Sequence, residues 1–163
     1  MRLEGKVALI TGGGGGIGRQ TALAFAAEGA RILATDVNSE AGAETVSLVE
    51  KAGGEAIYQD ADVSKAADCE AMVQAAEDHF GRLDILFNNA GISQPRTPTC
   101  EVTEELFDKV ISVNLKGTFF GCKHALPALL RRFPTLAPAE DFEDVAFRSF
   151  HFIYGLKSLE VNW

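Results

Sequence analysis

The sequence of 163 residues predicts an α/β fold of the Rossmann type, with a doubly wound parallel sheet that is truncated after its fourth strand and the helix following it. Two observations lead to this prediction. Short apolar runs alternate with longer helical patterns as far as residue 130, as expected for parallel strands joined by helices. The first apolar run also leads directly into a glycine-rich turn that opens a helix, Thr11-Gly12-Gly13-Gly14-Gly15-Gly16-Ile17-Gly18.

The elements follow one another in a regular order. Compact apolar runs mark the strands, and longer segments of mixed polarity mark the helices. The expected strands are residues 7–11, 31–36, 56–59 and 83–87, and the expected helices are residues 17–28, 39–52, 65–80 and 103–130.

Residues that favour helix ends support these boundaries. Asn38 or Ser39 is expected to cap the second helix, Ser64 the third and Thr103 the fourth, because their side-chain oxygens can accept hydrogen bonds from the first turn. Pro127 lacks the backbone N–H that a helix needs, so we expect it to kink or end the fourth helix.

The glycine-rich turn is typical of a site that binds the phosphates of a dinucleotide. Glycines at positions 12, 16 and 18 allow a sharp turn and the close approach of a pyrophosphate. The start of the following helix offers unpaired N–H groups and the positive end of its dipole. The alternative is a flexible strand–helix turn with no ligand.

Acidic and amide side chains follow the later strands. Asp36 ends the second strand, where its carboxylate can accept hydrogen bonds from the ribose hydroxyls of adenosine and would repel a 2′-phosphate, so NAD is preferred over NADP. Asp62-Val63 can flank an adenine ring, and Asn88-Asn89-Ala90-Gly91 can contact a cofactor at the carboxyl end of the fourth strand. The alternatives are a surface acid, a helix-cap sequence and an Asn-rich turn.

Composition and charge exclude several classes of partner. The chain is 47% hydrophobic and 23% charged, as in ordinary globular domains, and its net charge of −8 argues against nucleic acid or an anionic membrane surface as partner. No apolar run is long enough to span a bilayer, and the first residues lack the pattern of a secretory signal. The three cysteines are widely spaced, so we expect neither a disulfide framework nor a metal site, and we expect the cytoplasm as location.

The composition changes near residue 131. Of the 16 glycines, 15 lie at or before Gly121, whereas 7 of the 14 Phe, Tyr and Trp residues lie in the final 33 positions. Residues 134–144 contain two prolines and four acids and show no strand pattern. We therefore expect residues 1–130 to form an NAD-binding domain and residues 131–163 to form an atypical, aromatic-rich tail.

Taken together, the motifs of residues 1–130 resemble those of the short-chain dehydrogenase/reductase family in order and spacing. The resemblance rests on the glycine-rich turn, Asp36, Asp62-Val63, Asn88-Asn89-Ala90-Gly91 and Asn114. It implies hydride transfer between a nicotinamide and an alcohol or ketone, within a single domain built on a seven-stranded parallel sheet. The cofactor contacts that it implies are Gly12, Gly16, Ile17, Gly18, Asp36, Asp62, Val63, Asn89, Ala90 and Gly91.

The resemblance also implies catalytic residues. Asn114 matches the family's helix asparagine, which supports a proton-relay water. The family places a serine on a fifth strand and a Tyr-x-x-x-Lys pair on the next helix, and this chain offers Tyr154 and Lys157, with Ser158 at the expected lysine position and Asp141 roughly where the serine is expected. In this reading Tyr154 is the acid/base and Lys157 lowers its pKa. The alternative is an aromatic tail with a chance Tyr and Lys.

Two classes of function therefore follow from the sequence. The first is an NAD-dependent oxidoreductase that acts on a small alcohol or ketone. The second is a catalytically inactive, truncated dinucleotide-binding fragment or interaction module. Family members commonly pair through the helix that contains Asn114, which makes a homo-oligomer an expectation. In the family's strand order the fourth strand of this chain is left as an edge, which we expect the aromatic tail to cover.

Overall fold

The computed structural model describes residues 1–94, 96–131, 137–138 and 161–162. It divides into two compact units, residues 1–129 and 130–163. Strands and helices alternate through the first unit, and their bounds are β1 Val7–Thr11, α1 Gly16–Ala27, β2 Arg31–Asp36, α2 Ser39–Lys51, β3 Ala56–Asp60, α3 Ala66–Phe80 and β4 Ile85–Phe87. A 3₁₀ turn follows at Thr99–Glu101, and then helix α4 Glu104–Ile111, a π-helical turn Ser112–Lys116 and helix α5 Gly117–Leu130.

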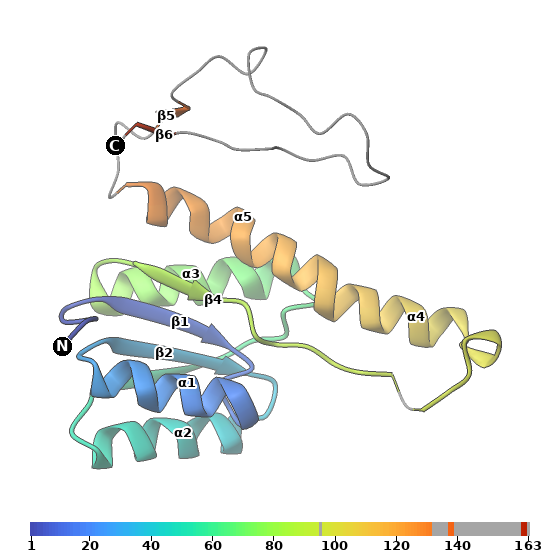
Figure 1. The fold of residues 1–163 in the computed structure, drawn as a ribbon, viewed down its shortest axis with the longest axis horizontal. Helices are drawn as coiled ribbons and strands as arrows, with labels where there is room; N and C mark the ends of the chain where they lie inside the picture. The colour runs from blue at the N-terminus through green and yellow to red at the C-terminus, as the bar shows by residue number, and fades with distance from the viewer. Residues whose placement is uncertain (95, 132–136, 139–160, 163) are drawn as a thin grey trace. The chain divides into compact units, whose positions relative to one another are not determined.

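The four strands of the first unit form one parallel sheet in the order β3-β2-β1-β4. Leu9 at the centre of β1 lies opposite Leu33 of β2 and Leu86 of β4. Helices α1 and α2 lie on one side of this sheet, and α3 lies on the other (Figure 1). The doubly wound Rossmann-type fold expected from the sequence is therefore confirmed.

Two apolar cores lie on opposite faces of the sheet, because successive side chains of a strand point to opposite sides. Val7 and Leu9 of β1 belong to one core, which α3 and α5 complete with residues such as Met72 and Ala125. The alternate residues of β1 belong to the other core, which Ala22 of α1 and Val49 of α2 help to close. All five residues of β1 are buried, as is typical of a central parallel strand.

Most of the expected helix ends are found. The Asn38 side chain accepts a hydrogen bond from the N–H of Ala41 (3.1 Å), and the Thr103 hydroxyl accepts one from Leu106 (3.3 Å). Gly81 ends α3 with a φ of 77°, a conformation that glycine adopts without strain.

Two expectations for individual segments were wrong, and a third holds only in part. Ser64 does not cap α3, because its hydroxyl donates to Asp62 and the N-cap residue is Lys65. The fourth strand begins at Ile85 rather than at residue 83, since Asp84 turns its carboxylate and its N–H to the start of β1. Of the two outcomes expected at Pro127, an end of the helix is not found, because α5 continues to Leu130. So close to the end of α5, a missing N–H removes only one helical hydrogen bond.

The second unit contains a short antiparallel pair of strands, β5 Ala137–Pro138 and β6 Val161–Asn162. Residues 134–144 show no strand pattern in the sequence, so β5 could not be expected from it. The expected cover of the β4 edge by the aromatic tail concerns residues that lie largely outside the described ranges.

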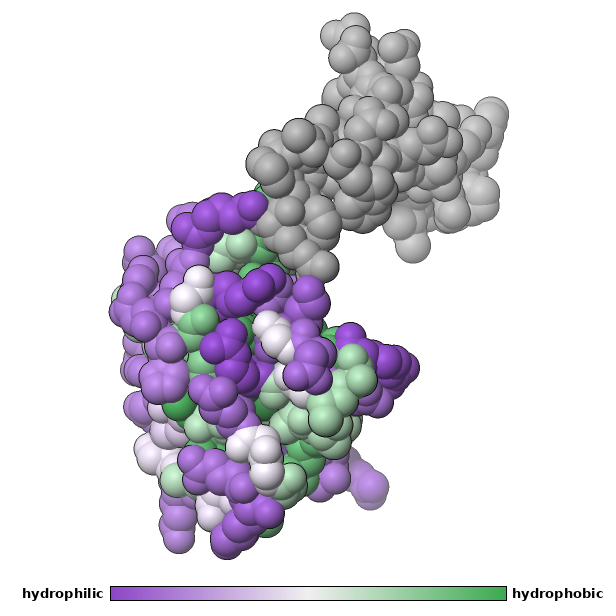
Figure 2. Space-filling model, turned by 90° about the vertical axis from the view of Figure 1, so that its left-hand side faces the viewer, coloured by the Kyte–Doolittle hydropathy of each residue, from purple (hydrophilic) through white to green (hydrophobic). Residues whose placement is uncertain are grey.

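The surface at the amino ends of the strands differs in character from the surface at their carboxyl ends. The face at the amino ends of the strands carries hydrophilic residues with smaller groups of apolar ones between them (Figure 2). The cleft described below lies at the carboxyl ends. None of the helices in the described ranges combines the length and the apolar character needed to cross a bilayer.

Candidate functional site

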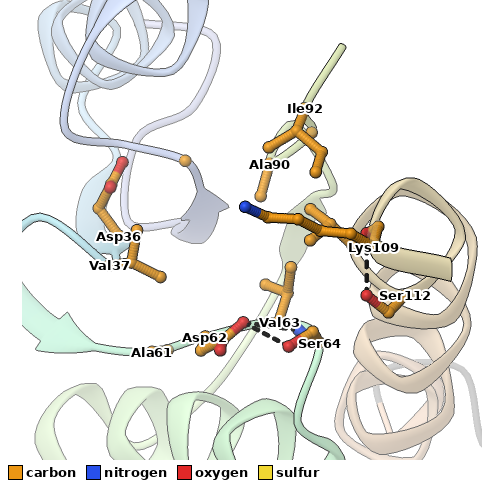
Figure 3. Close-up of a pocket in the computed structure, with 13 residues that line it drawn as sticks. Asp36, Val37, Ala61, Asp62, Val63, Ser64, Ala90, Ile92, Lys109 and Ser112 are labelled. Atoms are coloured by element: carbon orange, nitrogen blue, oxygen red, sulfur yellow. Dashed lines mark hydrogen bonds between the residues drawn. The ribbon is translucent and has the colours of Figure 1, made fainter. Parts of the chain in front are cut away.

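A cleft of about 420 Å³ lies where the carboxyl ends of the four strands meet. Its lining comes from the loop after each strand and from α4 and the π-helical turn (Figure 3). The lining residues are Gly12, Asp36, Val37, Ala61, Asp62, Val63, Ser64, Ala90, Gly91, Ile92, Lys109, Ser112 and Val113.

The glycine-rich turn forms one wall of this cleft and has no room for a side chain at Gly12 or Gly18. Gly12 has a φ of 65°, and a Cβ on it would lie 2.9 Å from the Cα of Ala90. A Cβ on Gly18 would collide with the carbonyl oxygen of Gly12, so the first turn of α1 packs directly under the loop. Gly15 precedes α1 and provides no side-chain cap, which leaves the first N–H groups of the helix open to a ligand.

The glycine turn is held from behind by Arg19 of α1 and Thr45 of α2. The Thr45 hydroxyl donates to the carbonyl of Gly13 (2.8 Å), and the Arg19 guanidinium donates to the carbonyl of Gly14. The same guanidinium contacts the Glu44 carboxylate (2.7 Å) and the Thr45 hydroxyl (3.0 Å). These bonds turn two carbonyl groups of the loop toward α2, away from the cleft.

Asp36 stands at the end of β2 with its carboxylate at the glycine turn. It accepts hydrogen bonds from the N–H of Gly14 (2.9 Å) and of Asn38 (3.0 Å). The Tyr58 hydroxyl donates to the Asp36 carbonyl (2.6 Å), and burial raises the pKa of Tyr58, so the phenol remains a donor at neutral pH. The ring of Tyr58 fits because residue 42 of α2 is glycine.

Asp62 and Val63 form the opposite side of the cleft, as their place after β3 predicts. The Ser64 hydroxyl, which donates to the Asp62 carboxylate at 2.7 Å, lowers the pKa of Asp62, and Lys65 at 3.6 Å acts in the same direction. Asp62 is therefore a carboxylate at neutral pH. Val63 is buried against Gly117 of α5.

Asn89 links the β4 loop to the glycine turn. Its side-chain amide donates to the carbonyls of Thr11 (2.9 Å) and Gly12 (3.2 Å). The buried Thr11 hydroxyl accepts hydrogen bonds from the N–H of Asn89 and of Ala90, both at 3.0 Å. Thr11 was not among the residues expected at the site, although a threonine at the end of a strand beside a glycine turn could have indicated this role.

Asn114 lies in the π-helical turn between α4 and α5 and makes two hydrogen bonds to one residue. Its side-chain oxygen accepts from the N–H of Ile92, and its amide donates to the carbonyl of Ile92, both at 2.9 Å. π-Helical turns are frequent at functional sites. This pair fixes the loop after β4 against the helix that forms the far wall of the cleft.

The structure brings most of the expected residues together. Gly12, Asp36, Asp62, Val63, Ala90 and Gly91 line the cleft. Gly16, Gly18 and Asn89 belong to the glycine turn and its supports, whereas Ile17 is 72% exposed at the start of α1. Tyr154 and Lys157 lie outside the described residues, as does Asp141.

Other lining residues had not been expected from the sequence. They are Val37, Ala61, Ser64, Ile92, Lys109, Ser112 and Val113. Most of them adjoin a motif residue along the chain. Lys109 has no such signal, because it reaches the cleft only through the position of α4.

The described residues suit a dinucleotide better than a metal ion. Within those ranges no group of three His, Cys, Asp or Glu side chains could hold a metal ion. The turn without Cβ atoms, the open helix start and the carboxylate of Asp36 instead form a cradle for a phosphate-linked ribose.

Comparison with known proteins gives a consistent result. The family model named short chain dehydrogenase matches residues 6–134. A Thermotoga maritima protein, named an uncharacterized oxidoreductase, is 46% identical over 132 residues, which are 81% of this chain and 51% of that protein. Levodione reductase of Leifsonia aquatica is 46% identical over 127 residues, which are 77% of this chain and 48% of the reductase.

Solved structures show the same relation. A crystal structure of levodione reductase superposes with a TM-score of 0.78 at 43% identity, covering 80% of this chain and 52% of that one. A short-chain dehydrogenase/reductase from Burkholderia phymatum, solved in complex with NAD, gives a TM-score of 0.77 at 36% identity over 81% and 47% of the two chains. The chain thus spans about half the length of the relatives it matches.

Proposed function

Since the chain belongs to the short-chain dehydrogenase family, we propose that it is an oxidoreductase that binds NAD at the carboxyl end of its sheet. The reaction is hydride transfer between the nicotinamide and a small alcohol or ketone. The observation that carries the proposal is the cradle formed by the glycine turn and Asp36. The cofactor, when bound, supplies the group that accepts or donates the hydride.

The carboxylate of Asp36 is the basis for preferring NAD to NADP. It lies at the glycine turn, where it can accept hydrogen bonds from ribose hydroxyls. A 2′-phosphate would meet this negative charge. Arg19 contacts Glu44 and Lys65 contacts Asp62, so neither of these two cations is free to bind a 2′-phosphate.

For catalysis we assign roles to Asn114, Tyr154 and Lys157. The Tyr154 phenol would exchange a proton with the substrate oxygen, and the Lys157 ammonium would lower its pKa. Asn114 lies in the π-helical turn beside the cleft, which supports its role of holding a proton-relay water.

The first experiment is a titration of the purified chain with NADH, followed by nicotinamide fluorescence. We expect saturable binding that Asp36→Ala weakens, whereas Asp78→Ala on the exposed side of α3 leaves it unchanged. A folded chain that binds no NADH would overturn the proposal. Turnover with secondary alcohols and ketones is then measured, and Tyr154→Phe should abolish it while NADH binding is kept; binding without any turnover would identify an inactive dinucleotide-binding fragment.

We also propose that two copies associate through α4 and α5. Phe107, Ile111, Leu115 and Phe119 recur at every fourth position and are exposed, so the two helices present a large apolar stripe. Light scattering after gel filtration should report a dimer, and Leu115→Glu with Phe119→Glu should give a monomer with unchanged circular dichroism. A wild-type monomer at micromolar concentration would contradict this proposal.

We also propose that the protein works in a reducing compartment such as the cytoplasm. Cys69, Cys100 and Cys122 are all free thiols. Burial raises the pKa of Cys69, which keeps that thiol protonated and unreactive at neutral pH. Free thiols of this kind are usual where disulfides do not form.

A further inference from the structure

The charged groups of the cleft are distributed unevenly. Of the 13 described residues that line it, only Asp36, Asp62 and Lys109 carry a charge. Lys109 comes from α4, and its side chain extends into the cleft with the ammonium group on the side that faces Asp36 (Figure 3).

The two carboxylates are already engaged. Asp36 accepts hydrogen bonds from two backbone N–H groups, and Asp62 is bound by Ser64 and Lys65. The hydrogen bonds of Lys109 involve its backbone, whose carbonyl accepts from Ser112, and its side chain makes no hydrogen bond or ion pair with another described residue. The ammonium group therefore enters the cleft without a partner among the described residues.

From this arrangement we propose that Lys109 is a further cofactor-binding residue, whose ammonium group pairs with a phosphate of the dinucleotide. This inference rests on the proposed function. A pyrophosphate carries negative charge, the chain has a net charge of −8, and the glycine turn offers only neutral N–H donors. A cation within the cleft offsets that repulsion.

The other basic groups near the cleft cannot take this role. The Arg19 guanidinium lies behind the glycine turn, where it contacts the carbonyls of Gly14 and of Ala41 in α2 and the Glu44 carboxylate. Lys65 pairs with Asp62 on the opposite side. Lys109 is the one cation among the described lining residues, and its flexible stem allows the ammonium to follow a phosphate.

The test compares two ligands that share adenosine and differ in phosphate. ADP-ribose contains the pyrophosphate and adenosine does not, and both are measured by displacement of NADH. Lys109→Met keeps the length of the side chain without its charge. We expect this substitution to raise the dissociation constants of NADH and ADP-ribose about tenfold and to change that of adenosine by no more than about twofold. Added salt should also weaken the binding of NADH less in the variant than in the wild type.

Two further variants complete the experiment. Lys109→Arg should restore most of the affinity, and Lys51→Met, which removes the same charge in the last turn of α2, should bind like the wild type. If Lys109→Met binds ADP-ribose as tightly as the wild type does, or if its affinity for adenosine falls as much as its affinity for ADP-ribose, the inference is wrong while the proposed function stands. If the wild type binds no NADH, both are wrong.

Discussion

At the scale of single residues, the glycine turn depends on two separate constraints. Gly12 has a positive φ and also faces the backbone of Ala90, whereas Gly15 has an extended backbone and open space around it. Two glycines of the same motif therefore differ in their tolerance of a side chain.

Gly12→Ala should consequently lower stability and abolish NADH binding. The backbone conformation alone costs about 1–2 kcal/mol for alanine, and the collision with Ala90 adds to it. Urea unfolding followed by circular dichroism measures the loss. Gly15→Ala is the matched control, and equal effects of the two substitutions would contradict this account.

Arg19 should act as a positioning residue for the same turn. Its side chain is only 19% exposed and makes charge-assisted hydrogen bonds to the turn and to α2. Arg19→Met should destabilise the chain by about 1–3 kcal/mol and raise the dissociation constant of NADH. Arg2→Met, which breaks an ion pair whose arginine is 87% exposed, should change neither value measurably. If Arg2→Met had the larger effect on stability and on NADH binding, Arg19 would not be a positioning residue.

At the scale of elements, Asp84 joins the starts of β1 and β4. Its carboxylate accepts from the N–H of Val7 (3.0 Å) and from Arg82 (2.6 Å), and its N–H donates to the Val7 carbonyl. Burial acts to raise the pKa of Asp84, but the hydrogen bonds from Arg82 and Val7 together with nearby positive charge lower it overall.

This lowered pKa gives stability a definite pH dependence. The carboxylate stabilises the fold above its unfolded pKa of about 3.9, and the contribution is lost as pH falls through the folded value. Asp84→Asn should cost about 1–3 kcal/mol at pH 7, and the difference from wild type should shrink toward pH 3. Unfolding curves at several pH values test this, with the exposed Asp78→Asn as control; a difference independent of pH would refute it.

The sequence predicted those elements whose signals are local. The first three strands are found close to their expected bounds because each is a compact apolar run, and Asn38 and Thr103 cap helices as their types suggest. Sequence alone could not give the π-helical turn, which accompanies the pairing of Asn114 with the distant Ile92.

The residues of the candidate site likewise fall into those that local sequence signals predict and those that only the tertiary structure places. Asp36 and Asp62 could be predicted because they lie at or just after the ends of strands and because motif spacing marks them. The roles of Arg19 and Lys109 depend on how α2 and α4 lie against the glycine turn and the cleft. Such contacts between distant segments leave no periodic pattern in the chain.

At the scale of the whole molecule, cofactor binding should stabilise the first unit as one body, since the cleft joins loops after all four strands. At a concentration of one hundred times its dissociation constant, NADH adds about 2.7 kcal/mol, or about 5–10 °C in melting temperature for a chain of this size. NADPH at the same concentration should add less, and Asp36→Ala should narrow the gap. Scanning fluorimetry measures both, and equal shifts in the wild type would contradict the preference for NAD.

The place of β1 has a consequence for synthesis. It precedes β2 and β4 in the chain, yet it lies between them in the sheet. The hydrogen bond between Val7 and Asp84 joins residues 77 positions apart. One edge of the fully buried strand β1 therefore stays unpaired until β4 has been synthesised, at about 5–20 residues per second. For several seconds after β2 has emerged, the nascent chain carries an open strand edge, and chaperone contact is expected in that interval.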